Sequence, residues 1–273
     1  VNEVYRYSMK RLIYQVAVGD RSDLYEHCIS SAKQYAESIG ADHIVQRQPK
    51  LRVVPNVFTN GRSCPKTSGW KKLGYLPIFE KENAFELLSD YDQILILDAD
   101  IYVRPGSPNI FDELGEEYAF GGVAEMDMPI TQEHSRKIRQ YSIMQYQKVA
   151  NDRNWVSNKV CGFEFYNMGL MLLNSKKIIP ALRGQTPMQF LERPEFREML
   201  DGVGAYKWST DQTMLNYWVR KEGLPCKNLD WKWNALYGSL KPESEKNAHF
   251  IHFYLKDKLP ERGENVSALM EKI

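Results

Sequence analysis

Segments with the apolar spacing of strands alternate along this chain with segments that have the spacing of helices. Residues 12–18 form an apolar, strand-like run, and apolar positions then recur at helical spacing from Leu24 to Ile39, where Gly40 supplies a stop signal. Residues 44–45 indicate a second strand. Strand, helix, strand is the unit from which parallel sheets are built. The pattern therefore predicts an α/β fold with a mostly parallel central sheet flanked by helices.

The alternation continues to the end of the chain without internal repeats, which predicts one domain over residues 1–273. We expect its first half, about 9–124, to bind a donor nucleotide and its second half, about 125–273, to bind an acceptor. Further strands are expected at 92–97, 118–123, 165–173 and 249–254, and helices at 70–88 with an interruption near Pro77, at 131–150 and at 211–221.

Composition excludes several classes of function. The chain has 36 Lys plus Arg against 35 Asp plus Glu, a net charge of +1, so we expect no nucleic acid partner. No apolar run approaches the ~20 residues that span a bilayer, so no membrane span is expected. Cys28, Cys64, Cys161 and Cys226 match no zinc or redox spacing. They are expected to be free thiols in a reducing compartment, which predicts a cytoplasmic location.

Two carboxylates end the most apolar strand of the chain, in the sequence Asp98-Ala99-Asp100. Two such groups on a turn can face one divalent cation, and Mg²⁺ or Mn²⁺ prefers oxygen ligands and leaves positions for phosphate oxygens. Asp90-Tyr91-Asp92 has the same spacing but precedes the strand. Ligands gather at the carboxyl ends of strands in open α/β sheets, which favours the later pair. The alternative is a solvated turn that follows a strand.

Residues 91–101 (YDQILILDADI) resemble the metal-binding strand end of GT-A glycosyltransferases, especially those of family 8. Five further segments of this chain resemble landmarks of that family, and they occur in the same order as in the family. Trp70-Lys71-Lys72-Leu73 is similar to the aromatic-x-Arg-Leu of the preceding helix, and Tyr166-Asn167-Met168-Gly169 is similar to the Asn-x-Gly strand near the sugar. Asp211-Gln212 resembles the segment beside the transferred sugar, and Trp233-Asn234 resembles a pair that follows it. Ile251-His252-Phe253 resembles the segment whose His completes metal coordination.

This resemblance implies a GT-A fold, Mn²⁺ or Mg²⁺ as cofactor, a nucleotide-sugar donor that is a UDP-sugar, and a saccharide or glycan acceptor. It implies that Asp98, Asp100 and His252 bind the metal, and that Ala99 and Lys72 lie against the donor. Three departures from the family are visible. Lys72 stands where the family has Arg, Tyr254 replaces a Gly, and Asp257 occupies the place of a Lys, with Lys256 and Lys258 on either side.

Other polar residues have a functional and a structural interpretation. Asp20 ends the first strand, where it can bind the base or ribose of a nucleotide or cap a turn. Asn167 can bind a sugar hydroxyl or be a buried Asn that the backbone satisfies. Asp211 can hold donor hydroxyls or act as general base if the reaction inverts the anomeric centre. Gln212 can lie at the reaction centre, although with Ser209 it also fits a capping box.

Histidines and aromatic residues of the second half add two expectations. His249 and His252 are three positions apart in an expected strand, so they should face opposite ways and only one can be a metal ligand. Aromatic rings stack on the C–H faces of sugars. Among the aromatic residues of this half, Trp231 and Trp233 are the favoured acceptor contacts.

The sequence therefore predicts a metal-dependent glycosyltransferase that moves a hexose from a UDP-sugar to a saccharide hydroxyl, with a retaining outcome favoured. Three alternatives remain open. One is an inverting transferase with Asp211 as base, and another is a non-catalytic carbohydrate-binding protein. The third is a sugar nucleotidyltransferase, but those enzymes carry a Gly-rich loop after the first strand, and residues 18–22 contain a single Gly.

Overall fold

The computed structural model of the protein describes residues 9–19, 22–57, 73–150, 155–255, 259–263 and 265–273. Its strands in these ranges are β1 (Arg11–Val16), β2 (Asp42–Gln46), β3 (Gln93–Asp98), β4 (Ile101–Val103), β5 (Phe120–Gly122), β6 (Ser157–Asn158), β7 (Gly162–Phe163), β8 (Leu170–Asn174), β9 (Cys226–Asn228), β10 (Ala235–Leu236) and β11 (Phe250–His252). The helices are α1 (Asp23–Ile39), α3 (Gln132–Ala150), α4 (Ser175–Leu182), α5 (Pro187–Leu191), α6 (Arg197–Asp201), α7 (Asp211–Lys221) and α8 (Val266–Met270), with a 3₁₀ segment η1 (Pro77–Leu87). No described helix is both long and apolar enough to cross a lipid bilayer.

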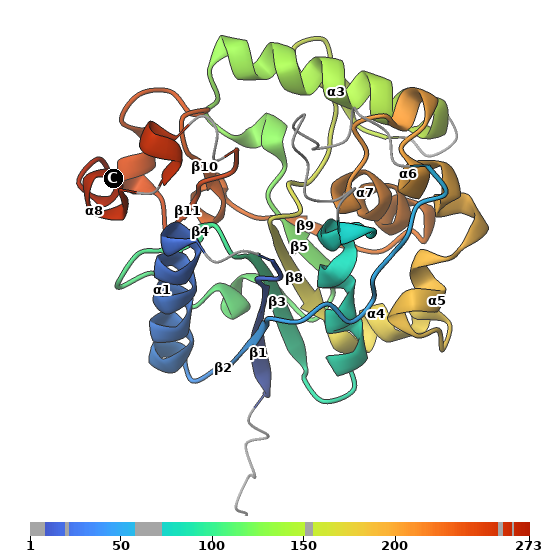
Figure 1. Ribbon diagram of the computed structural model, residues 1–273, viewed down its shortest axis with the longest axis horizontal. Helices are drawn as coiled ribbons and strands as arrows, with labels where there is room; N and C mark the ends of the chain where they lie inside the picture. The colour runs from blue at the N-terminus through green and yellow to red at the C-terminus, as the bar shows by residue number, and fades with distance from the viewer. Residues whose placement is uncertain (1–8, 20–21, 58–72, 151–154, 256–258, 264) are drawn as a thin grey trace, which may run out of the picture.

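The main sheet of the described chain has six strands in the order β2-β1-β3-β8-β5-β9. β1 pairs in parallel with β2 and β3, β8 runs antiparallel between β3 and β5, and β9 is parallel to β5. In Figure 1 the sheet lies in the middle, with α1 to one side, α4 to α7 to the other and α3 at the top. The predicted α/β fold with a mostly parallel sheet flanked by helices is confirmed.

The central strands are buried on both faces. Ile94 and Ile96 of β3 belong to the apolar cluster that α4 to α7 help to build, whereas Leu95 and Leu97 belong to the cluster under α1. Side chains alternate along a strand, so a continuous apolar run fills both cores at once. The carboxylate of Asp98 therefore lies at the end of β3, beyond the apolar residues of the strand.

A second sheet brings the end of the chain to the end of β3. It has the order β10-β11-β4. β4 begins directly after Asp100 and pairs antiparallel with β11, so that Ile101 lies opposite His252. The Phe253 amide also donates to the Asp100 carbonyl oxygen over 2.9 Å. This backbone ladder places His252 beside the two carboxylates.

Two expected elements differ from the sequence pattern. The described part of the segment 70–88 is a 3₁₀ helix beginning at Pro77, and it buries residues on every side instead of presenting one apolar stripe. The strand expected over 165–173 begins only at Leu170, because Met168 and Gly169 form a turn before it. By contrast, α1 ends at Gly40 with φ +68°, the left-handed conformation that glycine favours, as the stop signal predicts.

Candidate functional site

Three potential metal ligands meet where β3 ends. Asp98 ends β3, Asp100 follows it, and His252 ends β11. One ligand atom from each lies within 4.8 Å of the others. His252 Nε2 is 3.2 Å from Asp100 Oδ1 and 3.8 Å from Asp98 Oδ2. His249 instead packs its ring against Trp233, with 4.7 Å between the ring centroids, so of the two histidines only His252 lies at the cluster.

The cluster fits a hard divalent cation. Asp100 Oδ1 is buried and has no hydrogen-bond partner among the described residues, although it lies within ion-pair distance of His252. A buried carboxylate oxygen without a partner is costly. Two carboxylates and one imidazole are ligands that Mn²⁺ accepts, and Mg²⁺ shares the preference for carboxylate oxygens. A cation at this place would satisfy the oxygen.

Burial and mutual attraction shift the titration of this pair. Burial favours the neutral form of Asp100, but His252, a backbone hydrogen bond and Lys81 together outweigh it and hold the pKa of Asp100 below its usual value. Burial likewise opposes protonation of His252, but Asp100 and Asp98 together outweigh it and raise the pKa of His252. Without a metal, the proton shared by the pair therefore resides on the imidazole.

Lys81 lies at the centre of the site, although it is not among the residues predicted from the sequence. Its buried Nζ is 2.8 Å from Asp98 Oδ1, 2.8 Å from Asp211 Oδ2 and 2.9 Å from the Met168 carbonyl oxygen. Burial opposes the charge on Lys81, but Asp211 and Asp98 outweigh it and raise the pKa of the ammonium. The segment Phe79-Glu80-Lys81 carries the same aromatic-x-basic pattern as the segment that ends at Lys72, and this pattern could have identified it.

Two expected donor contacts, Asp20 and Lys72, lie outside the described residues. The substituted positions Lys256, Asp257 and Lys258 lie outside them as well. Ala99 is buried between the two carboxylates and lines a cavity beside them.

Asn167 and Gln212 both reach the site, but each is already engaged by the protein. Asn167 Oδ1 accepts from the Gly169 amide over 3.1 Å, and Asn167 Nδ2 donates to Glu125 Oε1 over 2.8 Å. Gln212 Oε1 accepts from the Met168 amide over 3.2 Å. The capping-box alternative for Gln212 is wrong, because the cap of α7 is Thr210, whose side chain accepts from the Gln212 amide.

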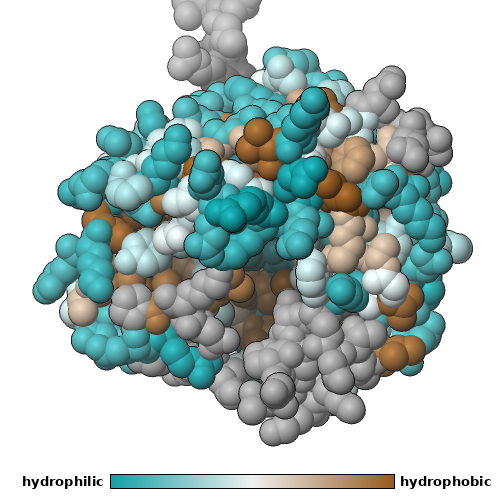
Figure 2. Space-filling model, turned by 90° about the horizontal axis from the view of Figure 1, so that it is seen from above, coloured by the Kyte–Doolittle hydropathy of each residue, from teal (hydrophilic) through white to brown (hydrophobic). Residues whose placement is uncertain are grey.

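Two cavities flank the metal cluster and share Ile78, Lys81, Asp98 and Asp100 as lining residues. The smaller, of about 190 Å³, is otherwise lined by Val16, Tyr25, Pro77 and Ala99. The larger, of about 390 Å³, includes Glu125, Asn167, Trp208, Asp211 and Gln212. Figure 2 shows that this face of the molecule is hollowed near its centre, with hydrophobic surface at the bottom of the hollow.

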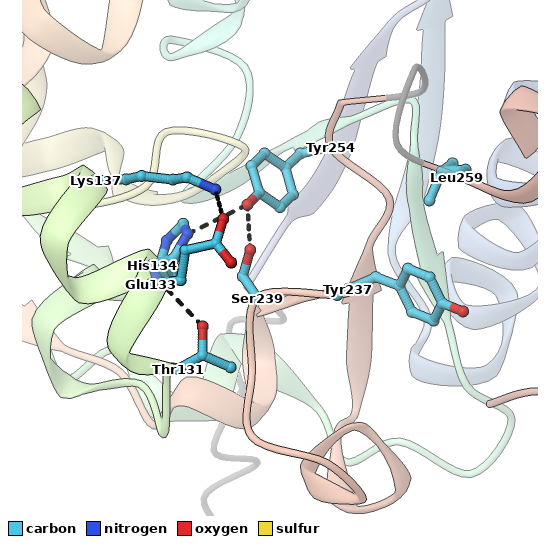
Figure 3. Close-up of a pocket in the computed structure, with 9 residues that line it drawn as sticks. Thr131, Glu133, His134, Lys137, Tyr237, Ser239, Tyr254 and Leu259 are labelled. Carbon is cyan, nitrogen blue, oxygen red and sulfur yellow. Dashed lines mark hydrogen bonds and ion pairs between the residues drawn. The ribbon is translucent and has the colours of Figure 1, made fainter.

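Two further cavities lie beyond the larger one, against α3. The first of them is lined by Glu125, His134, Tyr141 and Tyr254, among others. The second, of about 270 Å³, also has His134 and Tyr254 in its wall. Figure 3 shows this second cavity, in which the Tyr254 hydroxyl lies between Ser239 and His134. Tyr254 thus lines all three cavities on this side of the cluster.

The expected aromatic contacts of an acceptor are only partly available. Trp233 is 2% exposed and belongs to the core, so the expectation is wrong for this residue. Trp231 packs against the same core. Trp208, which is 41% exposed, lines the larger cavity beside the metal cluster.

No family model matches the chain, and no curated protein matches it in sequence. Solved structures do resemble it. A glycosyltransferase involved in glycosylation of the major capsid of PBCV-1 superposes with a TM-score of 0.51 at 14% identity, over 94% of this chain and 99% of that one. The galactosyltransferase LgtC, in complex with donor and acceptor sugar analogues, superposes with a TM-score of 0.50 at 15% identity, over 89% and 87% of the two chains. The predicted GT-A fold is thereby confirmed.

Replacing Gly169 should damage the metal site without unfolding the protein. A Cβ at this position would lie 2.3 Å from His252 Cε1 and 2.8 Å from its Nδ1, so Gly169→Ala must displace the imidazole. We expect Mn²⁺ affinity to fall by about 10- to 100-fold, as measured by electron paramagnetic resonance of free Mn²⁺. Gly115→Ala is the control, since its Cβ would meet only the exposed side chain of Glu117. Unchanged affinity in Gly169→Ala would show that His252 is not a ligand.

Mn²⁺ affinity should rise with pH between about pH 6 and about pH 8. A cation must displace the proton of His252, and the raised pKa of His252 keeps that proton bound further toward neutral pH than in a free imidazole. Raising the pH removes the competing proton and strengthens binding. Calorimetric titrations at three pH values would measure the slope. His249→Ala should keep the slope, and an affinity that is flat over this range in the unmodified protein would contradict the assignment.

Proposed function

We propose that this protein is a metal-dependent glycosyltransferase that moves a hexose from a UDP-sugar to a hydroxyl group of a saccharide. The observation that carries the proposal is the cluster of Asp98, Asp100 and His252, which lies at the carboxyl end of β3 and between two cavities in a GT-A fold. One structure of the same fold, LgtC, holds donor and acceptor sugar analogues. Membership of family 8 is part of this proposal.

The smaller cavity suits the nucleotide of the donor. The ring of Tyr25 and the apolar side chains of Val16, Pro77 and Ile78 can cover the faces of a base, and the two carboxylates stand at the end of the same cavity. A cation held by Asp98, Asp100 and His252 would neutralise the charge that grows on the diphosphate as the glycosidic bond breaks. Lys81, whose Nζ is 2.8 Å from Asp98 Oδ1, holds Asp98 in place for that task.

The larger cavity suits the transferred sugar and the acceptor. Asn167, Asp211 and Gln212 present polar groups to it, and the exposed indole of Trp208 offers a face for a sugar ring. In this proposal residues of about 9–124 bind the donor nucleotide, and residues of about 125–273 bind the acceptor. The free thiols of Cys28, Cys161 and Cys226 support the further proposal of a cytoplasmic location.

We propose a retaining reaction. A general base needs a carboxylate that faces the acceptor with a free lone pair. Of the two carboxylates that line the larger cavity besides the metal pair, Asp211 is paired with Lys81, and Glu125 accepts from Asn167 and lies 3.1 Å from the ring of His134. The departing phosphate can take this role. The bond from the anomeric carbon to the phosphate oxygen breaks, the acceptor oxygen bonds on the same face, and its proton passes to the phosphate.

The anomeric outcome tests this choice directly. With an α-linked UDP-hexose as donor, proton NMR of the first product formed should show an α-linkage. Asp211→Asn should lower the rate but keep the α-product, because the Lys81 contact is weakened and no base is lost. A β-linked product from the unmodified protein would support the inverting alternative with Asp211 as base.

A screen of UDP-, GDP- and dTDP-sugars tests the function itself. We expect slow hydrolysis of a UDP-sugar that EDTA abolishes and Mn²⁺ or Mg²⁺ restores. Asp100→Ala should lose this activity and keep the fold, because a carboxylate beside solvent-accessible cavities contributes little to the core. Asp92→Ala is the matched control, since Asp92 precedes β3 and accepts from the Lys10 amide.

Other outcomes of the same screen would point elsewhere. Full activity in Asp100→Ala would reject the metal role of this residue. Nucleotide-sugar binding without UDP release, across varied acceptors, would support a carbohydrate-binding protein. Release of pyrophosphate from a nucleoside triphosphate and a sugar phosphate would support a nucleotidyltransferase. The absence of any nucleotide binding would reject all three enzymatic interpretations.

A further inference from the structure

A chain of hydrogen bonds between buried side chains leads from the metal cluster into the protein. His252 Nδ1 lies 3.0 Å from Asn234 Oδ1, and Asn234 Nδ2 donates to Asn167 Oδ1 over 3.0 Å. Asn167 Nδ2 donates to Glu125 Oε1, and Glu125 Oε2 lies 3.1 Å from His134 Nε2. All five side chains are buried. Each side chain bonds to the next, so the orientation of one sets the orientation of its neighbour.

The Gly169 amide fixes the direction of this chain. A backbone N–H can only donate, and it points at Asn167 Oδ1 over 3.1 Å, so that atom is the amide oxygen. The other end of the same amide, Nδ2, faces the carboxylate of Glu125, which can only accept when ionised. Two independent partners thus give the same orientation for Asn167, and neither tolerates the reverse.

The orientation of Asn167 decides that of Asn234. Because Asn167 offers Asn234 an oxygen, Asn234 must face it with the NH₂ group, which also lies 3.4 Å from the main-chain oxygen of Asn167. The group that remains, Asn234 Oδ1, is an acceptor and faces His252 Nδ1. His252 Nδ1 must then carry a hydrogen. In the neutral imidazole the lone pair is therefore on Nε2, the nitrogen that faces Asp98 and Asp100.

We propose that Asn234 and Asn167 are positioning residues that fix the tautomer of His252, so that Nε2 presents its lone pair to a divalent cation. The proposal rests on the proposed metal site. Neutral imidazole has two tautomers, and only the one with hydrogen on Nδ1 can bind a metal through Nε2. Glu125 accepts from both directions and ends the chain of Asn donors.

The far end of the chain is anchored on α3. The His134 amide donates to Thr131 Oγ1 over 3.2 Å, and His134 Nδ1 lies 3.4 Å from the Tyr254 hydroxyl, which also bonds Ser239 (Figure 3). With hydrogen on His134 Nε2, this imidazole donates to Glu125 and accepts from Tyr254. Every hydrogen bond of the chain, from Ser239 to His252, then joins one donor to one acceptor.

NMR of protein labelled with ¹⁵N-histidine tests the tautomer without metal or donor. At a pH that leaves His252 neutral, its Nδ1 should show the shift of a protonated nitrogen and its Nε2 that of a lone-pair nitrogen. The signal is assigned by its loss in His252→Ala. In Asn234→Ala the hydrogen of His252 should move to Nε2 in most molecules. In Asn167→Ala the same shift should occur in a smaller fraction of the molecules. A wild-type His252 with its hydrogen on Nε2 would overturn the proposal.

Metal binding provides the second readout. Asn234→Ala should weaken Mn²⁺ binding by about 10- to 100-fold, the usual effect of removing a partner of a ligating histidine. Gln93→Ala is the matched control, because it removes a buried amide with hydrogen bonds to Phe111 and Leu114 at the opposite end of β3. It should keep wild-type affinity. Equal losses of Mn²⁺ affinity in Asn234→Ala and Gln93→Ala would overturn the proposal, as would wild-type affinity in Asn234→Ala. If the unmodified protein did not bind Mn²⁺, the metal site itself would be rejected.

Discussion

A single buried ammonium group organises this site. Lys81 contacts Asp98 at the end of β3, Asp211 at the start of α7 and the carbonyl oxygen of Met168 before β8. A buried charge without partners destabilises a fold by several kcal/mol, on the order of 3–5 when one member of a pair is removed. The 3₁₀ segment, the central strand and α7 must therefore meet at one place, and they do so beside both cavities. The same interaction occupies Asp211, and for this reason the proposed reaction does not use Asp211 as a general base.

The parts of the fold that the sequence predicts are those encoded locally. The apolar run that becomes β3, and the helix that ends at Gly40, follow from spacing alone. Asp98 and Asp100 follow from their place at the end of that run. Lys81 does not stand out by apolar spacing, because a long charged side chain in a segment without one apolar face resembles a solvated residue. Only the aromatic-x-basic pattern that it shares with Lys72 marks it. Glu125 and His134 were missed because only the tertiary structure brings them together.

The segment Asn167-Met168-Gly169 had two interpretations from the sequence, and the close approach of the Gly169 backbone to the His252 side chain explains it. Asn167-Met168-Gly169 was expected to lie near a sugar, and Asn167 does line the larger cavity. The absence of a side chain at Gly169 also lets the imidazole of His252 lie against the backbone, where a Cβ would be 2.3 Å from it. Asn167 in turn accepts from the amide of that glycine. One short turn therefore borders the cavity and supports the metal cluster behind it.

The antiparallel ladder between β4 and β11 sets how this architecture can change over evolutionary time. Ile101, which directly follows Asp100, pairs with His252. Backbone hydrogen bonds between the two strands therefore hold His252 beside the two carboxylates, and the long stretch of chain between them is not needed for this. Insertions in that stretch can remodel the larger cavity while the ladder stays intact. A single-residue insertion within β4 or β11 would turn the imidazole to the opposite face of the small sheet. Insertions are thus tolerated in the loops but not within the six residues of β4 and β11.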